Sequence, residues 1–209
     1  PIDKDIVMQS YYWIGEINSI NQNFQEAIIS YKSVLNKENN KQSEIYIKTE
    51  YGLAYAYYNI QDYRNSLFYF ENYEKSNPQI SDVTLRIADI NLYNKKYEKA
   101  EEKYIAAITK ITTNKDYAYY QLGITRKYIA NKNKEAISAF ATIIKSYPKS
   151  TLYEIAIFQK SQLEIIEGNQ DEAYRGFSKL INNNLSSIKF EPEALIKRAS
   201  ISNNKANYI

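Results

Sequence analysis

Residues 122–148, LGITRKYIANKNKEAISAFATIIKSYP, contain every element of the pattern that decides the fold. Gly123 follows an aliphatic residue, Ala136 precedes Phe140 by four positions after an Asn-rich segment, and Pro148 closes the stretch. Residues four apart share one face of a helix, and a small side chain lets a neighbouring backbone come close. Asn suits a short connection between helices, and Pro ends a helix. The stretch therefore predicts two helices packed as an antiparallel pair.

The same pattern occurs five times along the chain, with a period typical of solenoids built from helix pairs. A small residue followed four positions later by an aromatic one recurs every 34 to 39 residues, at Ala27/Tyr31, Ser66/Phe70, Ala100/Tyr104, Ala136/Phe140 and Ala173/Phe177. An inner small residue lies 12 or 13 positions earlier in each copy, at Gly15, Ala54, Ala88, Gly123 and Ser161. We expect eleven helices, at about 4–20, 24–37, 43–59, 63–76, 80–94, 97–111, 115–130, 133–146, 150–167, 170–183 and 191–202, with a further turn at Asn203-Asn204.

Composition supports a helical chain and narrows its function. Gly and Pro contribute only 5 and 4 of the 209 residues, whereas tight turns and β-rich folds need more of both. The chain has no Cys, which excludes disulfides and thiolate chemistry, and no His, the commonest metal ligand and general base. A net charge of +3 is too balanced for a phosphate-neutralising surface, and no apolar run is long enough to span a bilayer. We therefore expect no catalytic site, no metal or other cofactor and no nucleic-acid partner.

These residues resemble the tetratricopeptide repeat (TPR) family over roughly residues 6–185. The shared features are the aliphatic–small pair of each first helix, the small-to-aromatic step and closing Pro of each second helix, and the aromatic residue that begins the second helix at Phe24, Tyr63 and Tyr97. The resemblance implies an all-α, superhelical α-solenoid of antiparallel helix pairs. It also implies that one flank of the first helices faces a concave groove where partner peptides bind.

Two copies depart from the family pattern. The fifth places Lys160 and Glu164 where the family packs an aliphatic and an aromatic residue, which predicts a rotated or less buried helix. The first lacks the closing Pro and has about five extra residues near 41–43. We expect 1–209 to form a single solenoid, as one segment of a longer bacterial protein. Its repeats are expected at about 4–41, 43–79, 80–114, 115–149 and 150–185, with a partial repeat at 186–209.

Helical geometry divides the first helices into a packing flank and a groove flank. The packing flank includes Ile14 and Leu53, which we expect to be buried within their repeats. The expected groove residues are Tyr12, Glu16, Tyr51, Tyr55, Tyr58, Leu85, Asp89, Leu92, Tyr120, Ile124, Lys127 and Phe158. This flank is more apolar than the packing flank, which is unusual for a surface left in water. Either a protein partner covers it, or tight superhelical curvature lets neighbouring first helices bury each other's flanks.

The function that fits this pattern is a non-catalytic scaffold that docks a protein or peptide in the groove. The stripe formed by Tyr51, Tyr55 and Tyr58 suits binding anchors, because Tyr offers a large apolar area with a hydroxyl that can stay wet. A glycan-binding module that stacks sugars on tyrosines and a regulatory segment of a larger enzyme are the alternatives. The segment 148–150 resembles the inter-repeat step of periplasmic TPR proteins of envelope assembly, which implies a location in the periplasm or cell envelope.

Overall fold

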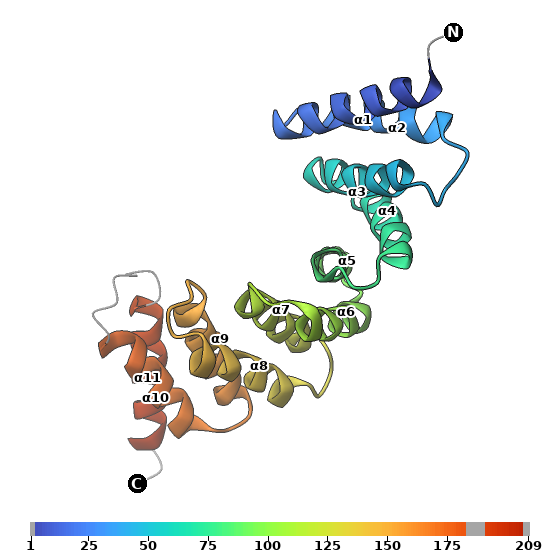
Figure 1. The fold of residues 1–209 in the computed structure, drawn as a ribbon. Coiled ribbons are helices and arrows are strands. Elements are labelled where there is room, and N and C mark those ends of the chain that lie inside the picture. Colours follow the sequence, from blue (N-terminus) through green and yellow to red (C-terminus); the bar gives the residue numbers. More distant parts are fainter. Residues whose placement is uncertain (1–2, 183–190, 207–209) are drawn as a thin grey trace. The chain divides into compact units, whose positions relative to one another are not determined.

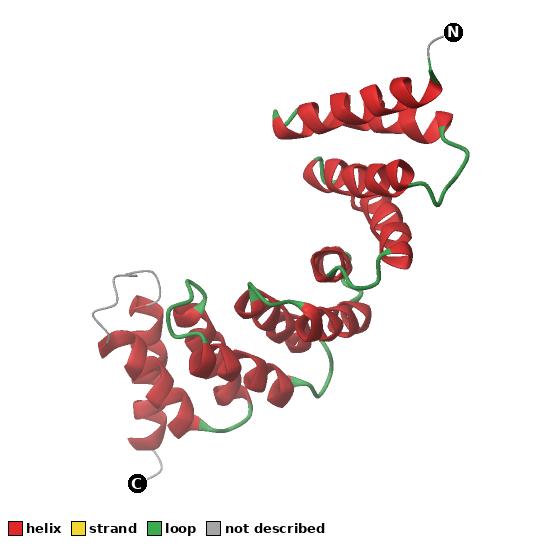
Figure 2. Cartoon of the chain, viewed as in Figure 1, coloured by secondary structure: helices red, strands yellow, loops and turns green. Residues whose placement is uncertain are grey.

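The computed structural model describes residues 3–182 and 191–206, and in this part of the chain it contains eleven helices and no strand (Figures 1 and 2). Their bounds are α1 (Lys4–Ile20), α2 (Phe24–Lys37), α3 (Glu44–Asn59), α4 (Tyr63–Ser76), α5 (Ser81–Tyr93), α6 (Tyr97–Lys110), α7 (Lys115–Lys127), α8 (Asn133–Ser146), α9 (Tyr153–Ile166), α10 (Gln170–Asn182) and α11 (Glu191–Ala206). The all-α architecture is confirmed. The turn expected at Asn203-Asn204 is wrong, because α11 continues through both residues.

Side chains and prolines set the ends of several helices. The Ser43 hydroxyl accepts a hydrogen bond from the Tyr46 backbone N–H at 3.3 Å and caps α3, and Asp62 caps α4 by accepting from the Asn65 N–H at 3.2 Å. Such caps satisfy backbone donors that have no partner inside the helix. Pro78 follows directly after the C-cap of α4 and stops helical hydrogen bonding there.

The short turns inside the five helix pairs share one backbone feature. Each contains one residue with positive φ, and it always lies five positions before the small residue of the second helix. These residues are Gln22 (φ 62°), Gln61 (63°), Lys95 (58°), Asn131 (62°) and Gly168 (81°). Gly, and then Asn and Asp, adopt this left-handed conformation most readily, so the presence of Gln and Lys at three of these positions is a finding of the structure.

The chain divides into two compact units, residues 1–90 and 91–209. In the first unit, α1 packs on α2, α2 on α3 and α3 on α4. In the second unit, each helix from α6 to α10 packs on the helix that follows it in the chain. Each helix therefore packs mainly on its neighbours in the chain, as expected of a solenoid.

The five aromatic residues of the small-to-aromatic step form the centres of the cores. Tyr31, Phe70, Tyr104, Phe140 and Phe177 are all at most 1% exposed. The inner small residues make room for them, since a Cβ added to Gly123 would lie 2.7 Å from the Phe140 ring. The small residue and the aromatic ring thus determine together how closely the two helices of a repeat approach.

Two residues of the packing flank meet different environments. Leu53 is buried, as expected from the sequence, whereas Ile14 is 46% exposed. The expectation that Ile14 packs within its repeat is therefore wrong.

The fifth first helix, α9, replaces the family's apolar pair by a buried ion pair. Glu164 is only 5% exposed, and its carboxylate accepts from Lys160 Nζ at 2.7 Å and from Asn169 Nδ2 at 2.7 Å. The side chain of Asn169 belongs to the turn after α9, so this network joins the helix to its connection. The polar departure seen in the sequence is therefore a satisfied interior contact.

Candidate functional site

The structure places all twelve expected groove residues in partly or fully buried positions. Leu85 and Phe158 are buried, each 4% exposed, and the other ten are partly buried. A surface made of such residues offers edges and hydroxyls to a partner more than whole side chains.

In the first unit, the tyrosine stripe of α3 packs against α4 and α5. The Tyr55 ring lies 5.0 Å from the Phe70 ring, with an interplanar angle of 89°. Its hydroxyl donates a hydrogen bond to Asp82 of α5. Burial and the Asp82 carboxylate both raise the pKa of Tyr55. Tyr51 and Tyr58 pack around the same Phe70 core.

Among the α5 residues expected in the groove, Asp89 is linked to the tyrosine stripe through Arg86. Asp89 accepts a hydrogen bond from Arg86 Nη1 at 2.5 Å, and the Arg86 guanidinium lies 6.0 Å from the Tyr58 ring centre. Leu85 is buried on the same helix. Leu92 lies beyond the unit boundary, in residues 91–209, and is partly buried there.

In the second unit, the expected groove residues are also tied to neighbouring helices. Tyr120 and Ile124 pack around the core that contains Phe140. Lys127 of α7 donates to Gln159 of α9, and burial lowers the pKa of this lysine. The ring of Phe158 lies 5.9 Å from that of Phe177.

Hydrogen bonds between successive first helices recur along this flank. They join α3 to α5 through Tyr55, α7 to α9 through Lys127, and α9 to α11 through Gln162, whose Nε2 lies 3.5 Å from the Glu193 carboxylate. The apolar residues of this flank pack instead on the core aromatic residues of their own repeats, as Tyr55 does on Phe70, Tyr120 on Phe140 and Phe158 on Phe177. This packing accounts for much of the apolar character that the sequence assigned to a groove.

Tyr12 and Glu16 of α1 both contact Tyr31 of α2, the second helix of their own repeat. Glu16 accepts a hydrogen bond from the Tyr31 hydroxyl at 2.5 Å, and the rings of Tyr12 and Tyr31 are 6.2 Å apart. Burial, helped by the Glu16 carboxylate, raises the pKa of Tyr12 to about 12. Tyr12 is therefore a neutral hydrogen-bonding group at physiological pH.

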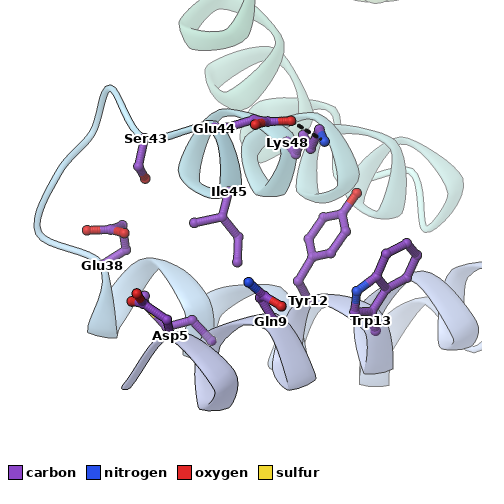
Figure 3. A pocket seen from close by; sticks show the side chains of 10 residues that line it. Asp5, Gln9, Tyr12, Trp13, Glu38, Ser43, Glu44, Ile45 and Lys48 are labelled. Carbon is purple, nitrogen blue, oxygen red and sulfur yellow. Dashed lines mark ion pairs between the residues drawn. The ribbon is translucent and has the colours of Figure 1, made fainter. Parts of the chain in front are cut away.

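An open pocket of about 470 Å³ lies between α1 and α3, with Tyr12 in its wall (Figure 3). Figure 3 shows Asp5 and Glu38 at one end of the pocket and Trp13 at the other. Trp13 is 61% exposed, and its ring meets that of Tyr12 edge to face at 5.4 Å. The lining residues are Asp5, Met8, Gln9, Tyr12, Trp13, Glu38, Ser43, Glu44, Ile45 and Lys48.

The charged groups of this α1–α3 pocket are predominantly acidic. Asp5, Glu38 and Glu44 stand against one cation, Lys48. A hydrogen bond from the Asn40 backbone N–H holds the pKa of Glu38 below its usual value, and Lys48, 2.5 Å from Glu44, does the same for that carboxyl. Glu38 and Glu44 are therefore ionised at neutral pH.

The loop between α2 and α3 supplies the part of the pocket that the sequence did not predict. Glu38 Oε1 accepts from the Asn40 N–H at 2.7 Å, and Asn40 Oδ1 accepts from the Gln42 N–H at 3.0 Å, which orders the loop. The extra residues near 41–43 were the sequence signal for this feature. Trp13, the single Trp of the chain, was a second signal.

Two kinds of feature are absent from the part of the chain that the structure describes. Across residues 3–182 and 191–206, no group of three or more acidic side chains is arranged to hold a metal ion. In the same part of the chain, no helix is long and apolar enough to cross a membrane.

Comparison with known proteins supports the fold. A tetratricopeptide repeat family model matches residues 117–150, which contain all of α8 and all but the first two residues of α7. A crystal structure of MamA protein aligns with a TM-score of 0.74 at 21% identity, covering 88% of this chain and 96% of that one. YrrB, described as a TPR protein with an unusual peptide-binding site, aligns with a TM-score of 0.73 at 16% identity, covering 90% of both chains. A tetratricopeptide repeat protein from Parabacteroides merdae aligns at 0.73 and 17% identity, covering 93% of this chain and 72% of that one. Comparison with curated proteins found no match.

Proposed function

We propose that this chain, which has the TPR solenoid fold, is a non-catalytic scaffold that docks a protein or peptide. The partner binds on the first-helix side of residues 1–90. The observation that carries this proposal is the α1–α3 pocket, which is open, 470 Å³ in volume, and bordered by a largely exposed Trp13. Exposed aromatic side chains beside a pocket are typical binding anchors. A peptide-binding site in YrrB, a protein of the same fold, is consistent with this function.

The pocket favours a basic side chain of the partner. Three carboxylates and one ammonium line it, and the Tyr12 and Trp13 rings offer aromatic faces to a cation. An Arg or Lys of a peptide would combine both interactions, with charge-assisted hydrogen bonds to carboxylates such as Glu38. Residues such as Tyr55 and Lys127 then act mainly by holding the first helices in place.

A peptide-library selection tests this function. Twelve-residue peptides displayed on phage are selected on the purified chain, and enriched peptides are measured by titration against Trp13→Ala and against Phe68→Ala. Phe68 is the matched control, because it is an exposed aromatic residue of the same unit but outside the pocket. We expect peptides rich in Arg or Lys whose affinity falls about 30-fold with Trp13→Ala, the equivalent of about 2 kcal/mol, and is unchanged with Phe68→Ala. Selection of no peptide, or equal binding by both variants, would rule out this site.

A further inference from the structure

The turn between α5 and α6 exposes two adjacent lysines. Lys95, at a φ of 58°, and Lys96, the N-cap of α6, are both exposed. Tyr93, which is 65% exposed, precedes Lys95 by two positions, and Tyr97 directly follows Lys96. We call residues 93–97 the lysine turn, and it carries two ammonium groups beside aromatic side chains.

The other adjacent basic pairs of the described residues are held by neighbouring side chains. Arg126 Nε donates to a carboxylate of α6, and Lys127 Nζ donates to an amide oxygen of α9. In the pair at 197–198, the Arg198 guanidinium lies 5.9 Å from the Tyr174 ring centre, and both basic residues are partly buried. Within residues 3–182 and 191–206, the lysine turn thus holds the adjacent basic pair whose two side chains are both exposed.

The charge of the chain is divided between its two ranges. Residues 1–90 contain 12 acidic and 8 basic residues, a net charge of −4, whereas residues 91–209 contain 12 acidic and 19 basic residues, a net charge of +7. The acidic α1–α3 pocket belongs to the first range and the lysine turn to the second. When two copies meet, opposite ranges attract and like ranges repel, so charge favours a head-to-tail approach.

The lysine turn has the chemistry that the α1–α3 pocket favours. Three carboxylates line the pocket against one ammonium, and those of Glu38 and Glu44 are ionised at neutral pH (Figure 3). The exposed Trp13 ring at the other end of the pocket offers an aromatic face to a cation. A turn projects beyond the ends of the two helices it joins, so its lysine side chains can enter an open pocket on another molecule.

We propose that the lysine turn of one copy of this chain binds in the α1–α3 pocket of a second copy. This rests on the proposed function, because it names the partner of the same pocket. The two surfaces differ, so the contact is heterologous, and each added copy presents a further pocket or a further turn. A single turn in a pocket makes a small interface, so the contact is weak and reversible.

Two complementary variants test the contact. The pocket variant carries Trp13→Ala and contains no Trp, because Trp13 is the single Trp of the chain. The turn variant carries Lys95→Gln and Lys96→Asn, which are the residue types at the same positions of the turn between α1 and α2, so its fold is kept. In a mixture of the two, all Trp emission comes from the turn variant, whose pocket is intact.

Titration of the pocket variant into the turn variant is expected to give a saturable shift of the Trp13 emission. Raising NaCl from about 50 mM to about 500 mM should weaken the binding about tenfold, because salt screens the charges. Two modified titrants test the role of the turn. Adding Lys95→Gln and Lys96→Asn to the pocket variant should weaken binding by about tenfold or more. Adding Lys145→Gln and Lys149→Gln removes two other exposed charges of the same range and should change binding less than about twofold.

The outcomes separate this proposal from the proposed function. Absence of a shift, or equal binding by the two modified titrants, would overturn the second copy as partner. An Arg- or Lys-rich peptide from the phage selection is titrated into the same turn variant. A shift with the peptide but none with the pocket variant rejects self-association and keeps the pocket as a binding site, whereas no shift with either rejects both.

Sedimentation velocity tests the head-to-tail arrangement. The mean mass of the unaltered chain should rise with concentration above the 24.5 kDa of one copy. An equal mixture of the pocket and turn variants should stop at dimers, because only one intact turn and one intact pocket can meet. Growth of the mixture beyond dimers would overturn the proposed contact.

Discussion

Tyr55 joins α3 to α5 through its hydroxyl, which donates to Asp82, while its ring packs on Phe70. At the level of single residues, the sequence correctly indicated that Tyr51, Tyr55 and Tyr58 share one side of a helix. It could not reveal that Asp82, 27 positions away, accepts a hydrogen bond from the Tyr55 hydroxyl, because that contact depends on how the next helix pair stacks.

Replacing Tyr55 by Phe should lower the free energy of unfolding by about 1–3 kcal/mol. The substitution keeps the ring but leaves the partly buried Asp82 carboxylate without this donor. Urea denaturation measures the change. Tyr128→Phe is the control, since the Tyr128 ring is 62% exposed and its stability should change by less than about 0.5 kcal/mol. Equal stability of wild type and Tyr55→Phe would show that the bond to Asp82 contributes nothing.

At the level of helix pairs, the inner small residue and the core aromatic ring determine how two helices pack. A Cβ at Gly123 would approach the Phe140 ring to 2.7 Å, and one at Gly15 would approach the Tyr31 ring to 2.5 Å. The sequence predicted this pairing from spacing alone. A helical Gly→Ala change normally stabilises by about 1 kcal/mol, so a loss of stability at these positions measures the contact directly.

Gly123→Ala should destabilise the chain by about 1–3 kcal/mol, because the new methyl group collides with a ring that is fully buried. Adding Phe140→Leu to Gly123→Ala should recover part of the loss, since the smaller side chain leaves room for the methyl group. Thermal unfolding of the two single variants and the double variant gives the coupling. Strictly additive effects would contradict direct contact between these positions.

An ion pair between Glu101 and Arg126 joins α6 to α7. Glu101 of α6 is 7% exposed, and its carboxylate accepts from Arg126 Nε of α7 at 2.8 Å and from Lys132. Burial favours the neutral acid, but the two cations outweigh it, and the pKa of Glu101 is lowered. The carboxylate therefore stabilises the fold while it is ionised.

Glu101→Gln should cost about 1–2 kcal/mol at pH 7 and should make stability less sensitive to acid. A lowered pKa in the folded state means that the contribution is present above the ordinary value of 4.5 and is lost as pH falls through the folded pKa. The gap between wild type and variant should therefore narrow between about pH 5 and pH 3. Denaturation at several pH values checks this, and a gap that stays constant would contradict the role of charge.

At the scale of the whole molecule, sequential packing makes stability a sum of local contributions. Each helix contacts mainly its neighbours in the chain, so a damaged repeat should loosen the repeats beside it first. This behaviour distinguishes a solenoid from a globular domain, in which a core mutation lowers protection throughout.

Phe140→Ala should lower stability by about 3–5 kcal/mol, because it removes a fully buried ring. Hydrogen exchange should rise most in α7 and α8, then in α6 and α9, and least in α1 and α2. Mass spectrometry of peptic fragments resolves these regions. A uniform rise along the chain would show global cooperativity and contradict sequential packing.

The repeat pattern in the sequence was enough to predict the fold. The sequence predicted only part of the candidate site. Helix bounds and the buried aromatics follow from spacings of four and of 12 or 13, which are local properties of the sequence. The α1–α3 pocket depends on the α2–α3 loop, where Glu38 and Ser43 reach a position set by tertiary packing. Leu85 and Phe158 were expected in a groove but are buried, because helical geometry gives a direction and not the distance to the next helix.

The residue with positive φ in each inter-helix turn is a position at which a substitution can stabilise this chain. Four of the five turns place a residue with a Cβ at a φ near +60°. A side chain is strained in this conformation, whereas Gly adopts it readily. Gln61→Gly should therefore raise the melting temperature, with a gain of about 0.5–1 kcal/mol, and a decrease would show that the turn tolerates its side chain without strain. Because the turns are far apart, such gains should add. A protein engineer, or natural selection, can thus stabilise the scaffold at Gln22, Gln61 and Asn131 without altering any surface proposed to bind a partner.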